Sequence, residues 1–211
     1  MGEFAVKTQA EVDEFLEHLN WNTLVETGLE KLLKSYVDAR LISKAHVEKT
    51  PYRFTKALEE LFGGTKMRPE DVLSTLFPLE GRAEMIHIKE MTFFSNCAHH
   101  LVPFFGKATF AYIPKDNIVG LSKIPRLLEV FARRPQVQEN LTTQVVDAFQ
   151  RIVSPQGCGM MVRAYHMCCA SRGIKQPTSY TETTAMRGVF ENGTTKAEFI
   201  AACNNIKFKV F

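Results

Sequence analysis

A thiol and two imidazoles lie within residues 95–100 of this 211-residue chain. Cys97 and His100 are three positions apart, so a backbone turn can bring both side chains to one metal ion. Zinc binds thiolate and imidazole, and a catalytic zinc site has three protein ligands and a fourth position open to water. A third candidate ligand lies downstream in residues 166–169, His-Met-Cys-Cys. The two clusters together predict a metal site, whereas the first alone fits a buried cysteine beside two surface histidines equally well.

Composition places the chain among ordinary globular proteins, with 45% apolar and 23% charged residues. The net charge of +3 is too small to indicate nucleic acid binding, and no apolar run is long enough to span a membrane. The first residues have no signal-peptide pattern. Five cysteines, two of them adjacent, indicate free or metal-bound thiols in a reducing compartment. We therefore expect a cytoplasmic protein that binds neither nucleic acid nor membranes.

Helical patterns dominate the first eighty residues. Apolar residues recur at helical spacing over residues 10–40, with a break at 20–22. Thr50-Pro51 is typical of a helix start, and Gly63-Gly64 of its end. A short helix is expected after Arg68-Pro69. We therefore expect a helical region over residues 1–80, followed by a catalytic domain over residues 81–211.

The later pattern alternates between strands and helices. Strands are predicted over residues 86–97 and 108–113, with a loop through Pro103 and Gly106 between them. Two consecutive helices follow, one capped by Ser122 and one opened by Pro135. Two more strands over 160–168 and 181–190 precede a last helix over 194–203. This β-β-α-α-β-β order predicts an α+β fold, an antiparallel sheet with two helices packed on one face.

Strand geometry places the two downstream cysteines on opposite faces and leaves open which of them is the ligand. Side chains alternate between the two faces of a strand. If the strand continues through residue 169, His166 and Cys168 face one side, and Cys169 faces the other.

Several ordered motifs resemble the GTP cyclohydrolase I family. They are Cys97-Ala98-His99-His100, residues 112–115 (Tyr-Ile-Pro-Lys), 120–123 (Gly-Leu-Ser-Lys), 134–139 (Arg-Pro-Gln-Val-Gln-Glu), 166–168 and 172–174. The resemblance extends from about residue 47 to about residue 203. It implies the tunnelling fold and a toroidal homo-oligomer, usually a decamer, with active sites between subunits. It also implies conversion of GTP and water to 7,8-dihydroneopterin triphosphate and formate.

The resemblance assigns Cys97, His100 and Cys168 as ligands of Zn²⁺. Zinc lowers the pKa of a bound water to about 7, which suits attack on C8 of guanine. His99 and His166 are then left for proton transfer, the task to which histidine is best matched near neutral pH. Standing alone, either histidine is better explained as a structural residue.

Substrate contacts are also implied by the resemblance. Gln138 and Glu139 match the pair that fills the guanine pocket. A carboxylate suits that pocket because it can accept hydrogen bonds from the N–H donors of guanine. Phosphate is expected at Ser122 and Lys123 at a helix start, and at Arg126 and Arg172. Arg53 and Lys56 match a motif that reaches phosphate from a neighbouring subunit. Without the motifs these residues fit solvated helix surfaces, and no P-loop sequence is present.

One position departs from the family pattern, which has Glu where this chain has Ala98. A carboxylate there can orient a histidine or contribute to a subunit contact. All three expected ligands and both histidines are retained, so we expect zinc binding to survive. Two alternatives remain open: a paralogue that stops at a formyl or ring-opened intermediate, and a non-catalytic nucleotide-binding subunit.

Overall fold

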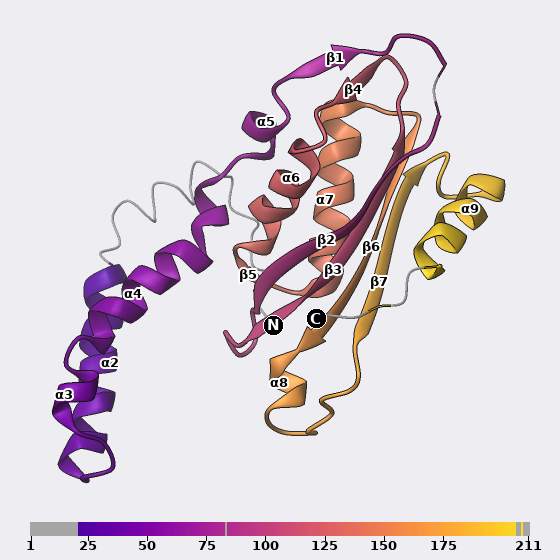
Figure 1. Cartoon of the computed structure of the whole chain (residues 1–211). Coiled ribbons are helices and arrows are strands. Elements are labelled where there is room, and N and C mark those ends of the chain that lie inside the picture. Colours follow the sequence, from indigo (N-terminus) through magenta and orange to yellow (C-terminus); the bar gives the residue numbers. More distant parts are fainter. Residues whose placement is uncertain (1–20, 83, 206–207, 209–211) are drawn as a thin grey trace, which may run out of the picture. The chain divides into compact units, whose positions relative to one another are not determined.

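The computed structural model describes residues 21–82, 84–205 and 208 (Figure 1). The chain forms two compact units, the first ending at Glu60 and the second beginning at Leu61. The helix expected over residues 10–20 lies outside the described residues. The expected boundary after residue 80 stays a prediction. In the described part of the chain, no helix is both long enough and apolar enough to cross a membrane.

The first unit is helical, as its sequence pattern predicts. It contains α2 (Trp21–Asp38), α3 (Lys44–Val47) and α4 (Thr50–Leu61), whose last residue belongs to the second unit. The side chain of Ser43 caps α3 by accepting a hydrogen bond from the Ala45 N–H. The amide of Asn22 donates to Glu59 Oε1 over 2.9 Å, which ties α2 to α4.

The second unit is built on a five-stranded sheet with the order β5-β2-β3-β6-β7. Its long strands are β2 (Ile86–Cys97), β3 (Pro103–Ile113), β6 (Gly157–His166) and β7 (Thr181–Gly188), which pair antiparallel. The short β5 (Pro135–Gln136) pairs parallel to the end of β2. A separate two-stranded sheet joins β1 (Leu76–Pro78) to β4 (Asn117–Val119).

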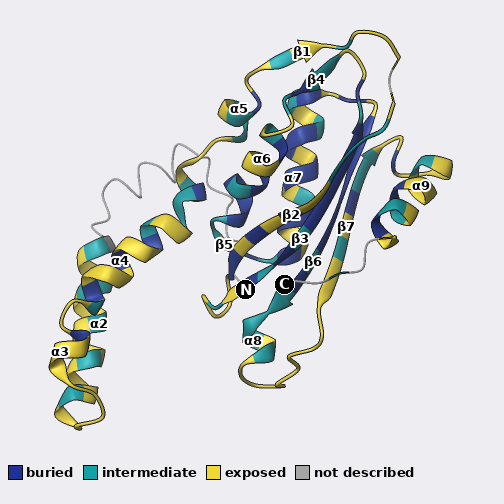
Figure 2. Ribbon diagram, in the orientation of Figure 1, coloured by how far each residue is buried: buried dark blue, intermediate teal, exposed yellow. Residues whose placement is uncertain are grey.

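Helices α6 (Lys123–Ala132) and α7 (Gln138–Val153) cover one face of the large sheet (Figure 1). The main core lies between them and the sheet, where buried residues concentrate (Figure 2). A smaller cluster around Phe190 and Phe199 lies under α9 (Gly193–Asn204) on the other face. The short helices η1 (Gly63–Lys66), α5 (Pro69–Val72) and α8 (Met167–Ala170) complete the unit. The predicted α+β tunnelling fold, with two consecutive helices on one face of the sheet, is confirmed.

Three local predictions were wrong. The expected loop through Pro103 and Gly106 is the first half of β3. Pro135 opens the two-residue β5 and not a helix, and α7 begins only at Gln138. Proline is tolerated there because a short edge strand does not need its missing N–H. Ser122 precedes α6, but its side chain makes no capping hydrogen bond.

Gly106 is required by the close approach of β3 and β6. A Cβ added there would lie 1.9 Å from the carbonyl oxygen of Arg163, which is main chain and cannot move aside cheaply. We expect Gly106→Ala to lower the free energy of unfolding by about 2–4 kcal/mol, measured in urea at fixed protein concentration. Gly63→Ala is the control, because its added Cβ meets nothing within 4 Å. Equal stability of the two variants would contradict this explanation.

Candidate metal centre and active site

The end of β2 and the turn after it hold the first two candidate ligands. Cys97 is the last residue of β2 and is 7% exposed. The N–H groups of His100 and Leu101 both donate to the Cys97 carbonyl, over 3.2 and 2.8 Å. Leu101 has a φ of 53°, a backbone conformation that is costly for a residue with a side chain. This tight turn brings His100 back toward Cys97.

Asn96 holds this turn in place and was missed at the sequence level. Its side chain is 4% exposed, and Nδ2 donates to the carbonyl oxygen of Leu101 over 3.1 Å. The main-chain N–H of Ala98 donates to the Gln136 carbonyl over 2.8 Å, which fastens the turn to β5. The only sequence signal for Asn96 was its place directly before Cys97.

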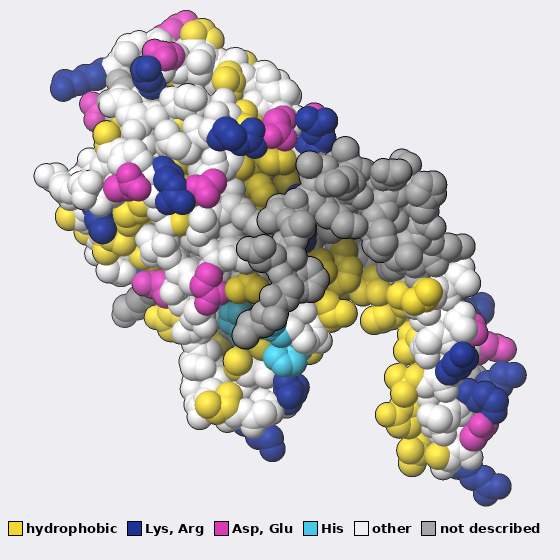
Figure 3. All heavy atoms as spheres, turned by 180° about the vertical axis from the view of Figure 1, so that it is seen from behind, with side chains coloured by type: hydrophobic (Ala, Val, Ile, Leu, Met, Phe, Trp, Pro, Cys, Tyr) yellow, Lys and Arg dark blue, Asp and Glu magenta, His cyan; other side chains and the backbone are white. Residues whose placement is uncertain are grey.

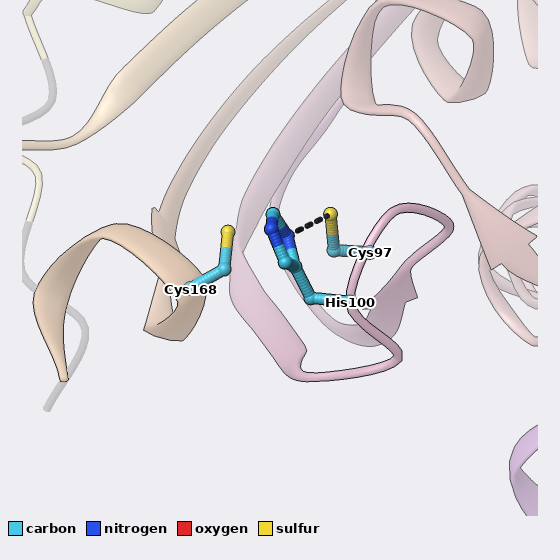
Figure 4. Close-up of side chains that lie close together, drawn as sticks. All are labelled: Cys97, His100 and Cys168. Carbon is cyan, nitrogen blue, oxygen red and sulfur yellow. Dashed lines mark hydrogen bonds between the residues drawn. The ribbon is translucent and has the colours of Figure 1, made fainter. Parts of the chain in front are cut away.

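The third candidate ligand comes from a distant part of the sequence, just after β6, which is two strands away from β2 in the sheet. Strand β6 ends at His166, and Cys168 lies in the helical turn α8. The ligand atoms of Cys97, His100 and Cys168 all lie within 4.8 Å of one another. Cys97 Sγ is 3.8 Å from His100 Nδ1, and the imidazole lies between the two thiols (Figure 4). The structure therefore brings together the three residues that the sequence selected.

The donor set fits a tetrahedral metal ion. Zn–S bonds of about 2.3 Å and Zn–N bonds of about 2.0 Å place tetrahedral ligand atoms roughly 3.5–3.8 Å apart. The separation of 3.8 Å between Cys97 Sγ and His100 Nδ1 is within about 0.3 Å of the roughly 3.5 Å that these bond lengths give for a sulfur and a nitrogen ligand. Two thiols and one imidazole are ligands that zinc accepts, and three protein ligands leave one position for water or substrate.

The expected separation of Cys168 and Cys169 onto opposite faces was wrong. It assumed a strand, but both residues lie in α8, where consecutive side chains do not alternate. Their sulfur atoms are 3.9 Å apart. Burial and the neighbouring thiols raise the pKa of Cys168 to about 11. Its thiol is therefore protonated at neutral pH until a cation displaces the proton.

The two candidate proton-transfer residues differ in environment. His99 is exposed in the turn, with Nδ1 3.7 Å from Cys97 Sγ. Histidine side chains reach the surface on the face shown in Figure 3, where acidic and basic side chains are interspersed. His166 is half-buried and stacks on Phe104, with ring centroids 4.7 Å apart and planes 3° apart. Burial lowers the pKa of His166, and the charge of Glu139 partly offsets this effect.

The expected guanine-binding pair splits into a buried and an exposed residue at the start of α7. Gln138 is 1% exposed, whereas Glu139 is exposed. The Gln138 side chain hydrogen-bonds His166 Nε2 over 2.8 Å, and its amide nitrogen contacts β6 and β7. Glu139 retains a carboxylate that can accept hydrogen bonds from a ligand.

The expected phosphate-binding residues fall into three places. Ser122, Lys123 and Arg126 lie at the start of α6. Helix α6 is about 15 Å long, and its other end leads into β5, which pairs with Asn96 and Cys97. These three residues therefore lie at the end of α6 that is farther from β5. Arg172 follows α8 directly. Arg53 and Lys56 belong to α4 in the first compact unit, where Lys56 pairs with Glu59 over 2.9 Å.

Thiol reactivity should distinguish the buried cysteines from the exposed one. Burial raises the pKa of Cys158 to about 12 and of Cys203 to about 11, and both are 1% exposed or less. Cys169 is exposed. In metal-free protein at pH 8 we expect iodoacetamide to modify Cys169 at least about 10²-fold faster than the two buried thiols. Peptide mass spectrometry would measure this, and comparable rates for Cys158 and Cys169 would contradict the description.

Comparison with known proteins identifies relatives over most of the chain. The family model described as GTP cyclohydrolase I matches residues 26–204. Proteins named GTP cyclohydrolase 1 from Brucella canis, Brucella suis and Brucella melitensis are each 48% identical over 143 residues. These matches cover 67% of this chain and 67% of each relative.

Solved structures also match part of the chain. One of them is the apo form of an archaeosine synthase QueF-Like, 16% identical, with a TM-score of 0.43. The match covers 51% of this chain and 97% of the other. Because the family model matches most of the chain and the Brucella proteins are 48% identical to it, this chain belongs to the GTP cyclohydrolase I family.

Proposed function

We propose that this protein is a zinc-dependent GTP cyclohydrolase I, which converts GTP and water to 7,8-dihydroneopterin triphosphate and formate. The observation that carries the proposal is the convergence of Cys97, His100 and Cys168, three residues from two distant segments, within 4.8 Å. Family membership supplies the substrate and the reaction.

Cys97, His100 and Cys168 would hold the ion as two thiolates and one neutral imidazole. Zinc bound by these residues supplies a Lewis acid that lowers the pKa of water to about 7 and makes it nucleophilic at neutral pH. Asn96 supports the ligand turn through Leu101, so it keeps His100 directed toward the two thiols.

His99 and His166 are proposed to move protons during ring opening and formate release. Both lie within two residues of a proposed ligand in sequence. The lowered pKa of His166 keeps its ring neutral at pH 7, so it can accept a proton. Glu139 is proposed to accept hydrogen bonds from guanine N1–H and the exocyclic amine. Adenine has no equivalent pair of donors, so this contact favours guanine.

The triphosphate is proposed to bind Ser122, Lys123, Arg126 and Arg172, with Arg53 and Lys56 contributing from a neighbouring subunit. The position of the first three at the far end of α6 supports an active site that is completed between subunits. A toroidal homodecamer, as the resemblance implies, provides such sites. Arg172, next to α8, is on the metal side.

The proposal is tested with purified, zinc-loaded protein and GTP, by following formate release and pterin fluorescence after oxidation. Both products are expected. Formate or a ring-opened species without pterin would indicate that the reaction stops early, as considered for Ala98. Neither product, from folded protein that carries zinc and binds GTP, would contradict the proposed activity and favour a nucleotide-binding subunit.

A further inference from the structure

The amide of Gln138 lies at the centre of a hydrogen-bond network whose directions can be assigned. Its nitrogen Nε2 contacts the carbonyl oxygens of Val162 and Thr181 and the hydroxyl of Thr183, over 3.1–3.2 Å. A main-chain carbonyl oxygen accepts hydrogen bonds and never donates them. Two such oxygens therefore fix the amide with its NH₂ toward β6 and β7. The reversed amide would place oxygen against oxygen at both contacts.

The hydroxyl groups beside the amide agree with this orientation. Thr142 Oγ1 lies 2.8 Å from the main-chain carbonyl oxygen of Gln138 and uses its only hydrogen there. It must then accept in its contact of 2.6 Å with Thr183 Oγ1. Thr183 consequently donates its hydrogen to Thr142 and presents an acceptor to Gln138 Nε2. The two hydrogens of the amide nitrogen are shared among three acceptors, so every donor in this group has an acceptor in this arrangement.

The orientation of the amide determines which ring nitrogen of His166 carries hydrogen. Gln138 Oε1 lies 2.8 Å from His166 Nε2, and an amide oxygen can only accept. His166 Nε2 must therefore be protonated. In a neutral imidazole the other nitrogen, Nδ1, then carries the free electron pair. Stacking on Phe104, with ring planes 3° apart, holds the plane of the ring, while the hydrogen bond holds its rotation.

We infer that Gln138 is a positioning residue that fixes the tautomer of His166, so that Nδ1 is the nitrogen that exchanges protons with the substrate. This inference rests on the proposed function for the identity of the substrate, but the tautomer follows from the network alone. It replaces the expectation that Gln138 contacts guanine, because the Gln138 side chain is 1% exposed and its amide is already bonded to protein groups. Glu139, which is exposed, then contacts guanine without help from the Gln138 side chain.

The first test measures the tautomer without any enzymatic activity. Protein labelled with ¹⁵N in its histidine rings would be studied as sedimented full-length protein by solid-state NMR, with and without zinc. His166→Asn identifies the signals by their loss. We expect wild-type His166 to have hydrogen on Nε2 and none on Nδ1. Gln138→Leu should give a mixture of tautomers or the opposite one, because the acceptor is gone. Thr142→Val is the matched control, since it removes a hydroxyl from the same cluster and keeps the acceptor for His166.

The second test separates positioning from substrate binding. Gln138→Leu is expected to lower kcat by about 10- to 100-fold, while KM for GTP changes by less than about threefold. A raised KM with unchanged kcat in Gln138→Leu would overturn the inference and support a guanine contact. A single unchanged tautomer in Gln138→Leu would also overturn it.

The two tests fail independently. If wild-type protein does not turn over GTP, the proposed function fails, and the NMR measurement still decides whether Gln138 fixes His166. If GTP is converted but wild-type His166 carries its hydrogen on Nδ1, the function stands and the positioning role does not.

Discussion

Replacing Cys168 by alanine is expected to abolish GTP turnover, with a loss of kcat of about 10³-fold or more, while the adjacent Cys169→Ala retains zinc and most of the activity. Both cysteines lie in α8, with sulfur atoms 3.9 Å apart. Cys168 is partly buried against the core and Cys169 is exposed, so the stability of both variants is measured beside their activity. Only Cys168 joins Cys97 and His100 in the cluster of ligand atoms. Losing one of three ligands weakens zinc binding, and without zinc the pKa of water rises back toward its value in bulk solvent, so water is no longer nucleophilic at neutral pH.

The measurements are zinc content after dialysis, GTP turnover and thermal stability on the same preparations. Cys168→Ala should contain little zinc, and excess zinc in the assay should restore little activity. A folded Cys168→Ala protein with wild-type turnover would show that this thiol is not needed. If Cys169→Ala loses zinc instead, the two thiols have been assigned the wrong way round.

Chelation should reproduce this loss reversibly in wild-type protein. The thiol of Cys168 has a raised pKa, so zinc must displace its proton, and zinc affinity should increase with pH between 6 and 9. The dependence has this sign because protons compete with the ion for the same sulfur. Zinc titration at three pH values would measure it.

Much of the fold could be predicted because the sequence carries local signals at each element. Thr50-Pro51 marks a helix start that the structure retains, and the strand ending at Cys97 has the predicted bounds. The errors arise where tertiary contacts override local preference. Pro135 has the sequence of a helix start, but pairing with Asn96 makes it an edge strand. Gly106 is a residue type that is common in loops, yet here its missing side chain lets β3 and β6 lie close to each other.

The site was predictable in its residue types and less so in its geometry. Cysteine and histidine are rare enough that their clustering indicates a metal, even though Cys97 and Cys168 are far apart in the sequence. The supporting residues carry no comparable signal, because asparagine, glutamine and threonine are common in all contexts. Asn96 and Gln138 act through contacts with Leu101 and His166 that only the folded backbone brings about. Reading Cys168 as part of a strand failed for the same reason, since α8 begins directly after His166.

Mixed oligomers of two inactive variants are expected to recover activity. Under the proposed arrangement a site takes its metal ligands from one subunit and phosphate contacts from another. Cys168→Ala lacks the first contribution, and the double variant Lys123→Ala/Arg126→Ala lacks the second. Removing two charge-assisted phosphate contacts should lower kcat/KM of the double variant by about 10²-fold or more. In hybrids of equal composition, about one quarter of the sites receive both intact contributions, so activity should approach roughly that fraction of the wild-type value.

The hybrids would be made by coexpression with two different affinity tags and purified through both, so that every oligomer contains both variants. The matched control pairs Cys168→Ala with His100→Ala. Both changes affect the metal cluster, so no site in that hybrid receives an intact set of ligands, whichever subunits meet. Recovery in the first hybrid and none in the control would establish a shared site. Inactivity of both hybrids would place the phosphate contacts and the metal in one subunit. The nucleotide would then have to span the length of α6, roughly 15 Å, which separates Lys123 from the residues that lead to Cys97.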